Sequence, residues 1–236
     1  DLNDIRHSFR LFAQRLPSDG VLIINHEIPN VQEITKDLPC QIIYYGKDQS
    51  SDYFASNITF NSFGCASFDC IHKGTCIGHF QLSVPGIHNV SNALASIALC
   101  RLLSIKEDQI EKGLNQFRGT DRRFQYKGSV GNVTVIDDYA HHPTEIKATL
   151  AAAKNYPHKS VWCVFQPHTY TRTKALMDEF AQALSLADHV ILADIYPARE
   201  TDNLGISSET LKEKIEALGT DVHYFPSFDQ IETFIL

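Results

Sequence analysis

The sequence predicts an α/β protein of two domains with largely parallel sheets. Short β-prone stretches alternate with stretches that carry apolar residues at helical spacing, which is the pattern of βαβ units. This alternation stops at residues 117–121, whose sequence FRGTD is typical of a linker, and then starts again. We therefore expect one domain over residues 1–118 and a second domain over residues 119–236.

The first domain is predicted to begin with an amphipathic helix over residues 4–16. A short apolar strand at 21–25 (VLIIN) is typical of the middle of a parallel sheet. Between Tyr53 and Val84, β-prone runs separated by Asn, Gly and Ser indicate hairpins at the sheet edge, with one turn at Lys73–Gly74. The remaining predicted elements are a helix near 29–37, a strand at 41–45, a helix that opens within 85–92, and a helix near 107–117.

The second domain is predicted to continue the strand and helix alternation. A helix is expected to begin at Pro143, because proline suits the first helical position and Glu145 then lies in the first turn. Val133, Val135 and Ile136 are expected to end a buried strand before it. The predicted strands are 123–128, 132–137, 161–165, 190–193 and 222–225, and the predicted helices are 143–155, 173–187, 207–218 and a final helix start.

Composition excludes several classes of protein. The formal net charge is −7 and no stretch is rich in Lys and Arg, so nonspecific nucleic-acid binding is not expected. No apolar run approaches the length of a membrane span, and no signal-peptide pattern is present. The sequence starts with DLND and stops at FIL inside a predicted helix, so we expect a fragment of a longer protein. Nothing in the sequence indicates an oligomeric state.

The six cysteines are scattered and form no Cys-x-x-Cys pair, which favours reduced thiols and a cytoplasmic protein. A zinc site is one interpretation of the segment 65–79, which contains three cysteines and two histidines. Its spacings match no common zinc pattern, and a hairpin at Lys73–Gly74 is the simpler interpretation.

Three polar segments follow predicted strands of the second domain: Asp137–Glu145 (DDYAHHPTE), Phe165–Lys174 (FQPHTYTRTK) and Asp194–Glu200 (DIYPARE). In a parallel sheet, the carboxyl ends of the strands lie at one edge, where ligands bind in open α/β folds. The start of the helix at Pro143 also offers unpaired backbone N–H groups to an anion. The sequence therefore predicts one cleft lined by all three segments.

Individual roles in these segments have alternatives. Asp137 or Asp138 could hold ribose hydroxyls or magnesium-bound water, or instead cap a helix or pair with one of the neighbouring arginines. The imidazoles of His141 and His142 could bind a metal or an anion, or serve as ordinary hydrogen-bonding groups.

Two arginines in the second and third segments suit a carboxylate or phosphate. Arg172 and Arg199 carry a fixed positive charge and can make bidentate contacts. Solvated salt bridges are the alternative for both.

A fourth candidate lies in the first domain, at the start of the helix that opens within 85–92. Asn89 and Asn92 are three residues apart there, so they could cap the helix. Their amides could instead match the donor and acceptor pattern of an adenine edge.

These residues together resemble the UDP-N-acetylmuramate–L-alanine ligases of the Mur ligase family. Five motifs occur in the family's order over about 120 residues, and the pattern of residues 1–85 also fits. The motifs are Gly86–Ala95 (GIHNVSNALA), Gly119–Phe124 (GTDRRF), Asp137–Glu145 (DDYAHHPTE), Phe165–Arg172 (FQPHTYTR) and Asp194–Glu200 (DIYPARE).

The resemblance implies that residues 1–118 are the second half of a central ATP-binding domain. Residues 119–236 would then be a truncated, Rossmann-like C-terminal ligase domain. Enzymes of this family use ATP and Mg²⁺ to convert the UDP-N-acetylmuramate carboxylate to an acyl phosphate, which the L-alanine amine attacks. Positioning and electrostatic stabilisation contribute most to such a phosphoryl transfer. The family assembles its site by closing one domain over the other.

The resemblance also implies a role for particular residues. His88, Asn89 and Asn92 would bind adenine, Arg123 would reach the nucleotide, and Asp138 would hold the ribose. The residues facing the reacting groups and the alanine carboxylate would be Tyr139, His141, His168 and Arg172. No residue of this chain is assigned as a metal ligand.

The chain departs from the family pattern in two respects. It contains no Gly-x-x-x-x-Gly-Lys-Ser/Thr phosphate loop, which in the family lies upstream with the magnesium-binding residues. Thr169 also stands where family members often have Arg. We therefore expect no ligase activity from the chain alone, and at most weak nucleotide binding.

Other functions remain as alternatives. A murein tripeptide ligase shares the DDxxHH type of loop, although the FQPHTY segment favours the alanine ligase. A nucleotide-binding module without catalysis would fit the missing phosphate loop. A metal hydrolase could use Asp138, His141 and His142. A dinucleotide dehydrogenase is disfavoured because no Gly-x-Gly-x-x-Gly motif follows a strand.

Overall fold

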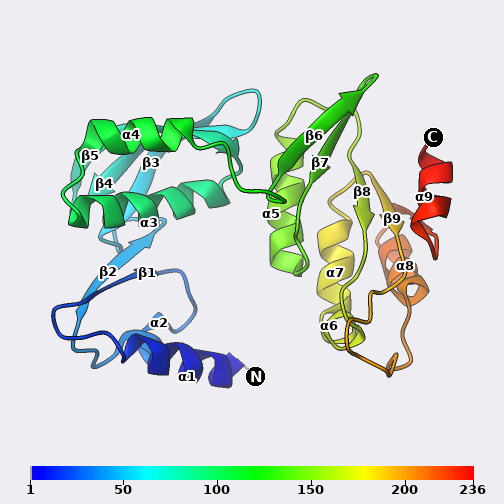
Figure 1. The fold of residues 1–236 in the computed structure, drawn as a ribbon, viewed down its shortest axis with the longest axis horizontal. Coiled ribbons are helices and arrows are strands. Elements are labelled where there is room, and N and C mark those ends of the chain that lie inside the picture. Colours follow the sequence, from blue (N-terminus) through cyan, green and yellow to red (C-terminus); the bar gives the residue numbers. More distant parts are fainter. Residues whose placement is uncertain (1) are drawn as a thin grey trace. The chain divides into compact units, whose positions relative to one another are not determined.

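The computed structural model describes residues 2–236 and consists of two compact units, divided between Arg118 and Gly119 (Figure 1). Each unit is an α/β assembly with its own hydrophobic core. No helix of the described residues is both long and apolar enough to cross a membrane.

The first unit contains one five-stranded sheet in the order β1-β2-β3-β4-β5. β1, β2 and β3 are parallel, whereas β3, β4 and β5 form an antiparallel meander. The predicted mixture of parallel strands and edge hairpins is confirmed. The elements are α1 (Leu2–Ala13), β1 (Val21–Asn25), α2 (Val31–Thr35), β2 (Gln41–Gly46), β3 (Tyr53–Phe60), β4 (Cys65–His72), β5 (Thr75–Pro85), α3 (His88–Leu102) and α4 (Glu107–Gln116).

The turn between β4 and β5 is the one predicted from Lys73–Gly74. Lys73 has φ 48° and Gly74 has φ 81°, so both central residues are left-handed. Two such residues make the tight turn whose twist matches antiparallel strands. Behind this meander, α3 packs its buried side chains onto the sheet, where the core is formed by Phe68, Phe80, Leu94 and Ile97.

Helix α1 forms where its periodicity predicts, but its apolar stripe is not buried within the unit. Ile5 is 52% exposed, Phe9 58% and Phe12 74%, whereas Ala13 is buried. The Arg10 guanidinium connects α1 to α2 by donating from Nη1 to the Glu33 carbonyl oxygen, 3.1 Å away. Helical spacing therefore predicts this helix correctly but does not identify the side chains that it buries.

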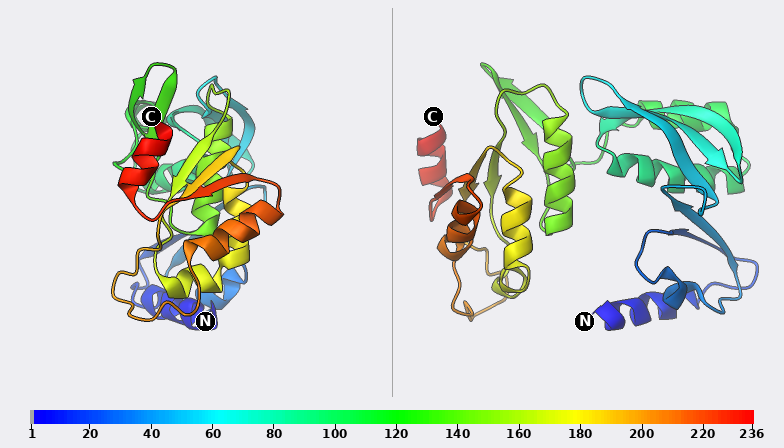
Figure 2. Two further views of the ribbon diagram at one scale, coloured as in Figure 1. Left: turned by 90° about the vertical axis from the view of Figure 1, so that its right-hand side faces the viewer. Right: turned by 180° about the vertical axis from the view of Figure 1, so that it is seen from behind.

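The second unit has a three-stranded parallel sheet in the order β10-β9-β8, and a separate hairpin of β6 and β7. α5, α7 and α8 cover one face of the parallel sheet, and α9 packs on the other (Figure 2). The elements are β6 (Gln125–Val130), β7 (Val133–Asp137), α5 (Pro143–Lys154), β8 (Trp162–Phe165), α6 (Tyr170–Ala175), α7 (Met177–Leu184), β9 (His189–Leu192), α8 (Ser208–Ala217), β10 (Asp221–Tyr224) and α9 (Phe228–Ile235).

Two predictions for this unit are wrong. Val133 is 63% exposed and Val135 is 47% exposed, so β7 is not a buried strand. It pairs antiparallel with β6 in a hairpin, and its apolar residues therefore do not lie between helices as in a parallel sheet. The single helix expected over 173–187 is instead two helices, because Leu176 (φ −121°, ψ 26°) interrupts the helical backbone between α6 and α7.

The packing of the second unit's core predicts how much a substitution at Phe180 lowers the unit's stability. Phe180 is fully buried and its ring centroid lies 5.7 Å from that of Phe165. Phe180→Ala should lower the free energy of unfolding of this unit by about 3–5 kcal/mol, through lost burial and the remaining cavity. Trp162, the single tryptophan, lies in this unit, so its fluorescence during urea unfolding reports the change.

The matched control is Phe228→Ala, since Phe228 is 58% exposed at the start of α9. Its effect should stay within about 0.5 kcal/mol. Equal effects of the two substitutions would contradict the assignment of Phe180 to the core.

Candidate functional site

The site in the second unit is built from three loops, which we call the first loop (138–142), the second loop (166–169) and the third loop (193–207). β8 and β9 pair in parallel with Phe165 opposite Leu192, so the second and third loops leave the same edge of the sheet. An isolated parallel bridge between His168 and Tyr196 extends this pairing. Thr169 N–H donates to the Tyr196 carbonyl oxygen at 2.9 Å, which holds the two loops side by side.

The first loop joins the other two through aromatic contacts. The ring of His141 lies 6.4 Å from that of His168, and the His168 ring lies 5.5 Å from that of Tyr196. Tyr139 meets His141 edge-on at 5.1 Å. The structure therefore brings the three predicted segments together, although the first loop follows the hairpin strand β7 and not a strand of the parallel sheet.

Asp138 fixes the shape of the first loop. Its two carboxylate oxygens accept hydrogen bonds from the N–H groups of Phe124 and Ala140, each at 2.8 Å. Helix α5 is capped instead by His142, whose Nδ1 accepts from Thr144 N–H at 3.3 Å. The hydrogen bonds of Asp138 thus connect the beginning of β6 to the segment that precedes α5.

The arginines beside this loop have other partners. The Arg123 guanidinium lies 3.6 Å from a carboxylate oxygen of Glu145. The Arg122 guanidinium lies over the Tyr139 ring, 4.4 Å from its centroid, in cation–π geometry. Glu145 therefore neutralises Arg123, and Arg122 stacks on the tyrosine that faces His141.

His141 is oriented by its backbone neighbours. Its Nδ1 lies 2.8 Å from the Tyr139 carbonyl oxygen, so Nδ1 carries a hydrogen and Nε2 is left for another partner. The His141 N–H donates to Glu145 at 3.0 Å. Partial burial acts to raise the pKa of Glu145, but this hydrogen bond and the neighbouring side chains of His141 and Arg123 hold it below its usual value. Glu145 is thus an anion that fixes the loop at neutral pH.

Two nitrogen atoms, one in the second loop and one in the first turn of α6, lack partners. His168 Nδ1 and Arg172 Nη1 are covered from solvent, and neither has a hydrogen-bond partner among residues 2–236. Leaving a covered donor unpaired costs about 1–3 kcal/mol, so such atoms are rare and need an explanation. Arg172 Nη1 is a donor, and His168 Nδ1 is a donor when it carries the ring hydrogen, so a carboxylate or phosphate oxygen would then satisfy both.

The third loop contributes Glu200, to which the sequence assigns no role. The N–H groups of Tyr170 and Thr171, at the start of α6, donate to Glu200 Oε2, and the Thr171 hydroxyl donates to Oε1. The Thr171 hydroxyl bond, the two N–H bonds and the charge of His168 hold the pKa of Glu200 below its usual value. These partners are about 30 residues apart, so no local spacing could reveal them. Arg199, by contrast, is exposed.

The predicted adenine-binding residues lie together in the first unit, at the start of α3. Asn89 Nδ2 donates to the Pro85 carbonyl oxygen at 2.8 Å, and Asn92 Nδ2 donates to Asn89 Oδ1 at 3.1 Å. The capping alternative for these asparagines is wrong, because the N-cap residue is Ile87 and no side chain caps α3. His88 lies beside Asn89, with its Nε2 3.2 Å from Asn89 Nδ2.

The structure of residues 2–236 gives no support to the two metal sites considered from the sequence. No group of three His, Cys, Asp or Glu side chains within residues 2–236 lies close enough to hold a metal ion. In the segment proposed for zinc, His79 instead pairs with Asp69 at 2.8 Å. All six cysteines are free thiols.

Family models match both units. Residues 1–100 match the Mur ligase middle domain, and residues 122–235 match the Mur ligase glutamate ligase domain. A UDP-N-acetylmuramate–L-alanine ligase of Agathobacter rectalis is 54% identical over all of this chain and 51% of its own length. One of Lachnospira eligens is 53% identical over all of this chain and 52% of its own. The chain thus spans about half the length of these curated relatives.

Solved structures agree with these matches. The UDP-N-acetylmuramate–alanine ligase of Thermotoga maritima has a TM-score of 0.72 and 25% identity, covering 95% of this chain and 54% of its own. A murein peptide ligase of Psychrobacter arcticus has a TM-score of 0.69 and 27% identity, covering 99% of this chain and 49% of its own. Together with the two matching domain models, these similarities show that the chain belongs to the Mur ligase family.

Proposed function

We propose that this chain forms about half of an ATP-dependent UDP-N-acetylmuramate–L-alanine ligase of peptidoglycan synthesis, and that its second unit binds the incoming amino acid. The observation that carries the proposal is the pair of unpartnered nitrogens, His168 Nδ1 and Arg172 Nη1, where three loops meet. Curated relatives at 45–54% identity, all alanine ligases by name, support the choice of substrate. The scattered free thiols suit a cytoplasmic enzyme.

In the proposed reaction, a carboxylate oxygen of UDP-N-acetylmuramate attacks the γ-phosphorus of ATP. This gives an acyl phosphate and ADP. The amine of L-alanine then attacks the acyl carbon, the amide bond forms, and phosphate leaves with the electron pair of the broken C–O bond. Both steps depend mainly on positioning and on stabilisation of negative charge.

The unpartnered nitrogens suit the carboxylate of alanine. A guanidinium can bind a carboxylate in bidentate contact, and such charge-assisted hydrogen bonds are stronger than neutral ones. His168 supplies a second donor when Nδ1 carries a hydrogen. His141 Nε2 and the Tyr139 hydroxyl are then available for the reacting groups, because His141 Nδ1 is already bonded to the Tyr139 carbonyl oxygen.

The residues proposed for the nucleotide are those that the family resemblance implies. Asn92, an exposed residue in the second turn of α3, would present its amide to adenine, with Asn89 holding it in place. Asp138 already accepts two N–H groups, but each carboxylate oxygen has a second lone pair for a ribose hydroxyl. Arg123 would reach the nucleotide from its position beside Glu145.

The family also implies Mg²⁺, which would neutralise phosphate charge in the reaction. The described residues contain no cluster of three metal-binding side chains, and the sequence has no phosphate loop. No residue of this chain is therefore assigned to hold the metal. The 236-residue chain alone should not turn over ATP.

A murein tripeptide ligase is the second candidate. The Psychrobacter arcticus structure supports it, at 27% identity over 99% of this chain. The two solved structures do not separate the candidates, since their identities are 25% and 27%. The alanine ligases are favoured because curated relatives of that name are 45–54% identical over the whole chain.

The substrate assignment can be tested in a reconstituted ligase, in which residues 1–236 replace the matching stretch of the Agathobacter rectalis relative. With ATP, magnesium and UDP-N-acetylmuramate, we expect phosphate release that depends on L-alanine. The 236-residue chain alone is the control and should release none. Turnover with tripeptide but not with alanine would contradict the proposal.

The role of Arg172 predicts a selective kinetic defect. In the reconstituted ligase, Arg172→Ala should raise KM for L-alanine roughly 10- to 100-fold, since a charged hydrogen bond contributes about 1.5–3 kcal/mol and each 1.4 kcal/mol is about tenfold. Arg172→Lys should recover only part of the loss, because lysine lacks the planar fork. Lys147→Ala, which removes an exposed cation of α5, is the control. An unchanged KM for alanine in Arg172→Ala would exclude this contact.

Replacing Asp138 should affect both the stability of the second unit and the binding of ATP. Asp138→Ala should lower the stability of the second unit by about 1–3 kcal/mol, because two N–H groups lose a charged acceptor. It should also raise KM for ATP in the reconstituted ligase at temperatures where the protein remains folded. Urea unfolding followed by Trp162 fluorescence measures the first effect and steady-state kinetics the second. A stability loss without a change in KM for ATP would restrict Asp138 to a structural role.

A further inference from the structure

The backbone turns sharply between the second loop and α6. Thr169, the N-cap residue of α6, has φ 68° and ψ 142°. A β-branched residue at positive φ is an outlier, and such strained residues persist only where the surrounding contacts hold them. His168 lies directly before this turn, and Arg172 lies in the first turn of α6 after it. The orientation of both side chains therefore depends on what holds Thr169.

Part of the restraint is local. The Thr173 hydroxyl donates to the Thr169 carbonyl oxygen at 2.7 Å, and Arg172 N–H donates to Thr169 Oγ1 at 3.4 Å. These bonds connect residues of the same turn. They restrain the turn internally, but they do not fix it to the rest of the unit.

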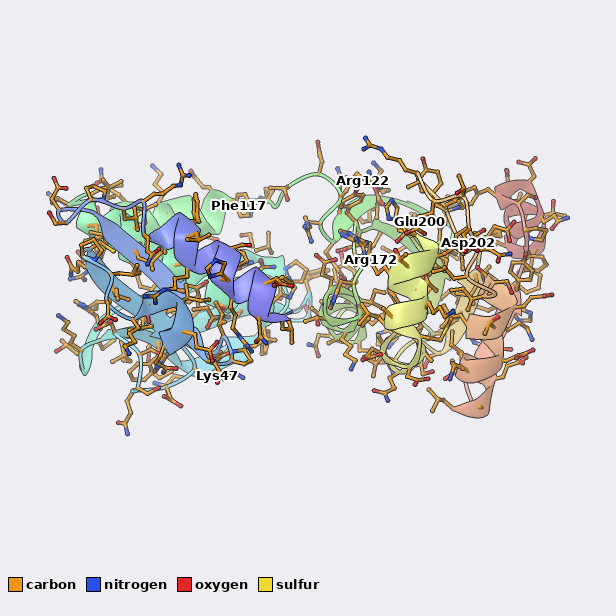
Figure 3. The ribbon with its side chains drawn as sticks, turned by 90° about the horizontal axis from the view of Figure 1, so that it is seen from below. Lys47, Phe117, Arg122, Arg172, Glu200 and Asp202 are labelled. Atoms are coloured by element: carbon orange, nitrogen blue, oxygen red, sulfur yellow. The ribbon has the colours of Figure 1, made fainter. Side chains whose placement is uncertain are left out.

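The other part comes from the third loop. Tyr196 accepts the Thr169 N–H, and Glu200 accepts the N–H groups of Tyr170 and Thr171 together with the Thr171 hydroxyl. Lys174 adds a bond from its Nζ to the Leu204 carbonyl oxygen at 2.8 Å. Glu200 therefore makes three of the bonds that join the start of α6 to the third loop. Figure 3 labels Glu200 and Arg172 among the side chains of this unit.

Glu200 also determines which groups are left for an anionic ligand. The first N–H groups of a helix are unpaired within the helix and would attract an anion. At α6 the carboxylate of Glu200 already occupies two of them. An incoming carboxylate must then be held by side chains, and the unpartnered nitrogens of His168 and Arg172 are nearby in the chain.

We infer that Glu200 is a positioning residue for amino-acid binding: its carboxylate fixes residues 168–171 so that His168 and Arg172 are oriented toward the carboxylate of the amino acid. The inference rests on the proposed function for the identity of the ligand. The positioning itself follows from the bonds between Glu200 and α6. Its hydrogen-bonded carboxylate has a pKa below the usual value, so it remains charged at neutral pH.

The test uses three substitutions: Glu200→Ala, Glu200→Gln and the control Asp202→Ala. Asp202 lies in the same loop, and its carboxylate accepts from Leu204 N–H at 2.9 Å. Removing it also deletes an acid from the third loop but leaves the bonds to Tyr170 and Thr171 in place. Glutamine keeps an oxygen that can accept the N–H groups and an amide that can donate to Thr171.

The first readout needs no activity. NMR signals of the His168 ring and the Arg172 guanidinium are recorded in the 236-residue chain. Glu200→Ala should shift both signals, Glu200→Gln should shift them less, and Asp202→Ala should leave them unchanged. Unchanged signals in Glu200→Ala would overturn the positioning role, even if the melting temperature falls.

The second readout is kinetic, in the reconstituted ligase. Glu200→Ala should raise KM for L-alanine by roughly 10- to 100-fold, since a misplacement of about 1 Å can cost about 100-fold. KM for ATP should stay unchanged, and Glu200→Gln should restore most of the alanine affinity. A lower melting temperature with an unchanged KM for alanine would make Glu200 a simple helix cap and overturn the inference.

The two readouts separate failure of this inference from failure of the proposed function. If the unsubstituted reconstituted ligase rejects alanine, the proposed function fails, and the NMR signals still decide whether Glu200 positions His168 and Arg172.

Discussion

The parallel pairing of β8 with β9 is the constraint on which the second unit's site depends. Because the two strands run in the same direction and in register, the loops that follow them leave one edge together. The bridge between His168 and Tyr196 continues this pairing past the strands, into the segment that carries the candidate ligand-binding groups. The first loop follows a hairpin strand and is not placed by this pairing. It lies beside the second loop through the contact between the rings of His141 and His168.

The acidic side chains near this edge of the sheet bind backbone N–H groups, whereas two of the basic side chains have nitrogen atoms without a partner in the described part of the chain. Glu145 and Glu200 are anions with lowered pKa values, and both accept backbone N–H groups that shape loops or helix starts. Arg123 is paired with Glu145, and Arg122 stacks on Tyr139. The covered nitrogens of His168 and Arg172 lack such partners. The acids thus maintain geometry, while the two unpartnered nitrogens are the groups that we propose for the ligand, in keeping with a preorganised electrostatic site.

The sequence predicted the alternation of strands and helices and the hairpin turn at Lys73–Gly74, because these follow from local pattern and turn chemistry. It also predicted that the three loops meet, from the rule for parallel sheets, although that rule applies only to the second and third loops. It did not predict that β7 is an exposed hairpin strand, since short apolar runs look alike in buried and exposed sheets. The role proposed for Glu200 depends on contacts about 30 residues away, which spacing does not encode. The spacing of apolar residues also gives no sign of the interruption at Leu176. The roles of the nine predicted site residues remain predictions.

A crystal structure of the reconstituted ligase with L-alanine and a non-hydrolysable ATP analogue would show directly which groups bind the amino acid. We predict that the alanine carboxylate lies within hydrogen-bond distance of Arg172 and His168, with the Glu200 carboxylate still bonded to the start of α6. A carboxylate bound elsewhere, with His168 Nδ1 and Arg172 Nη1 still unpartnered, would contradict the account.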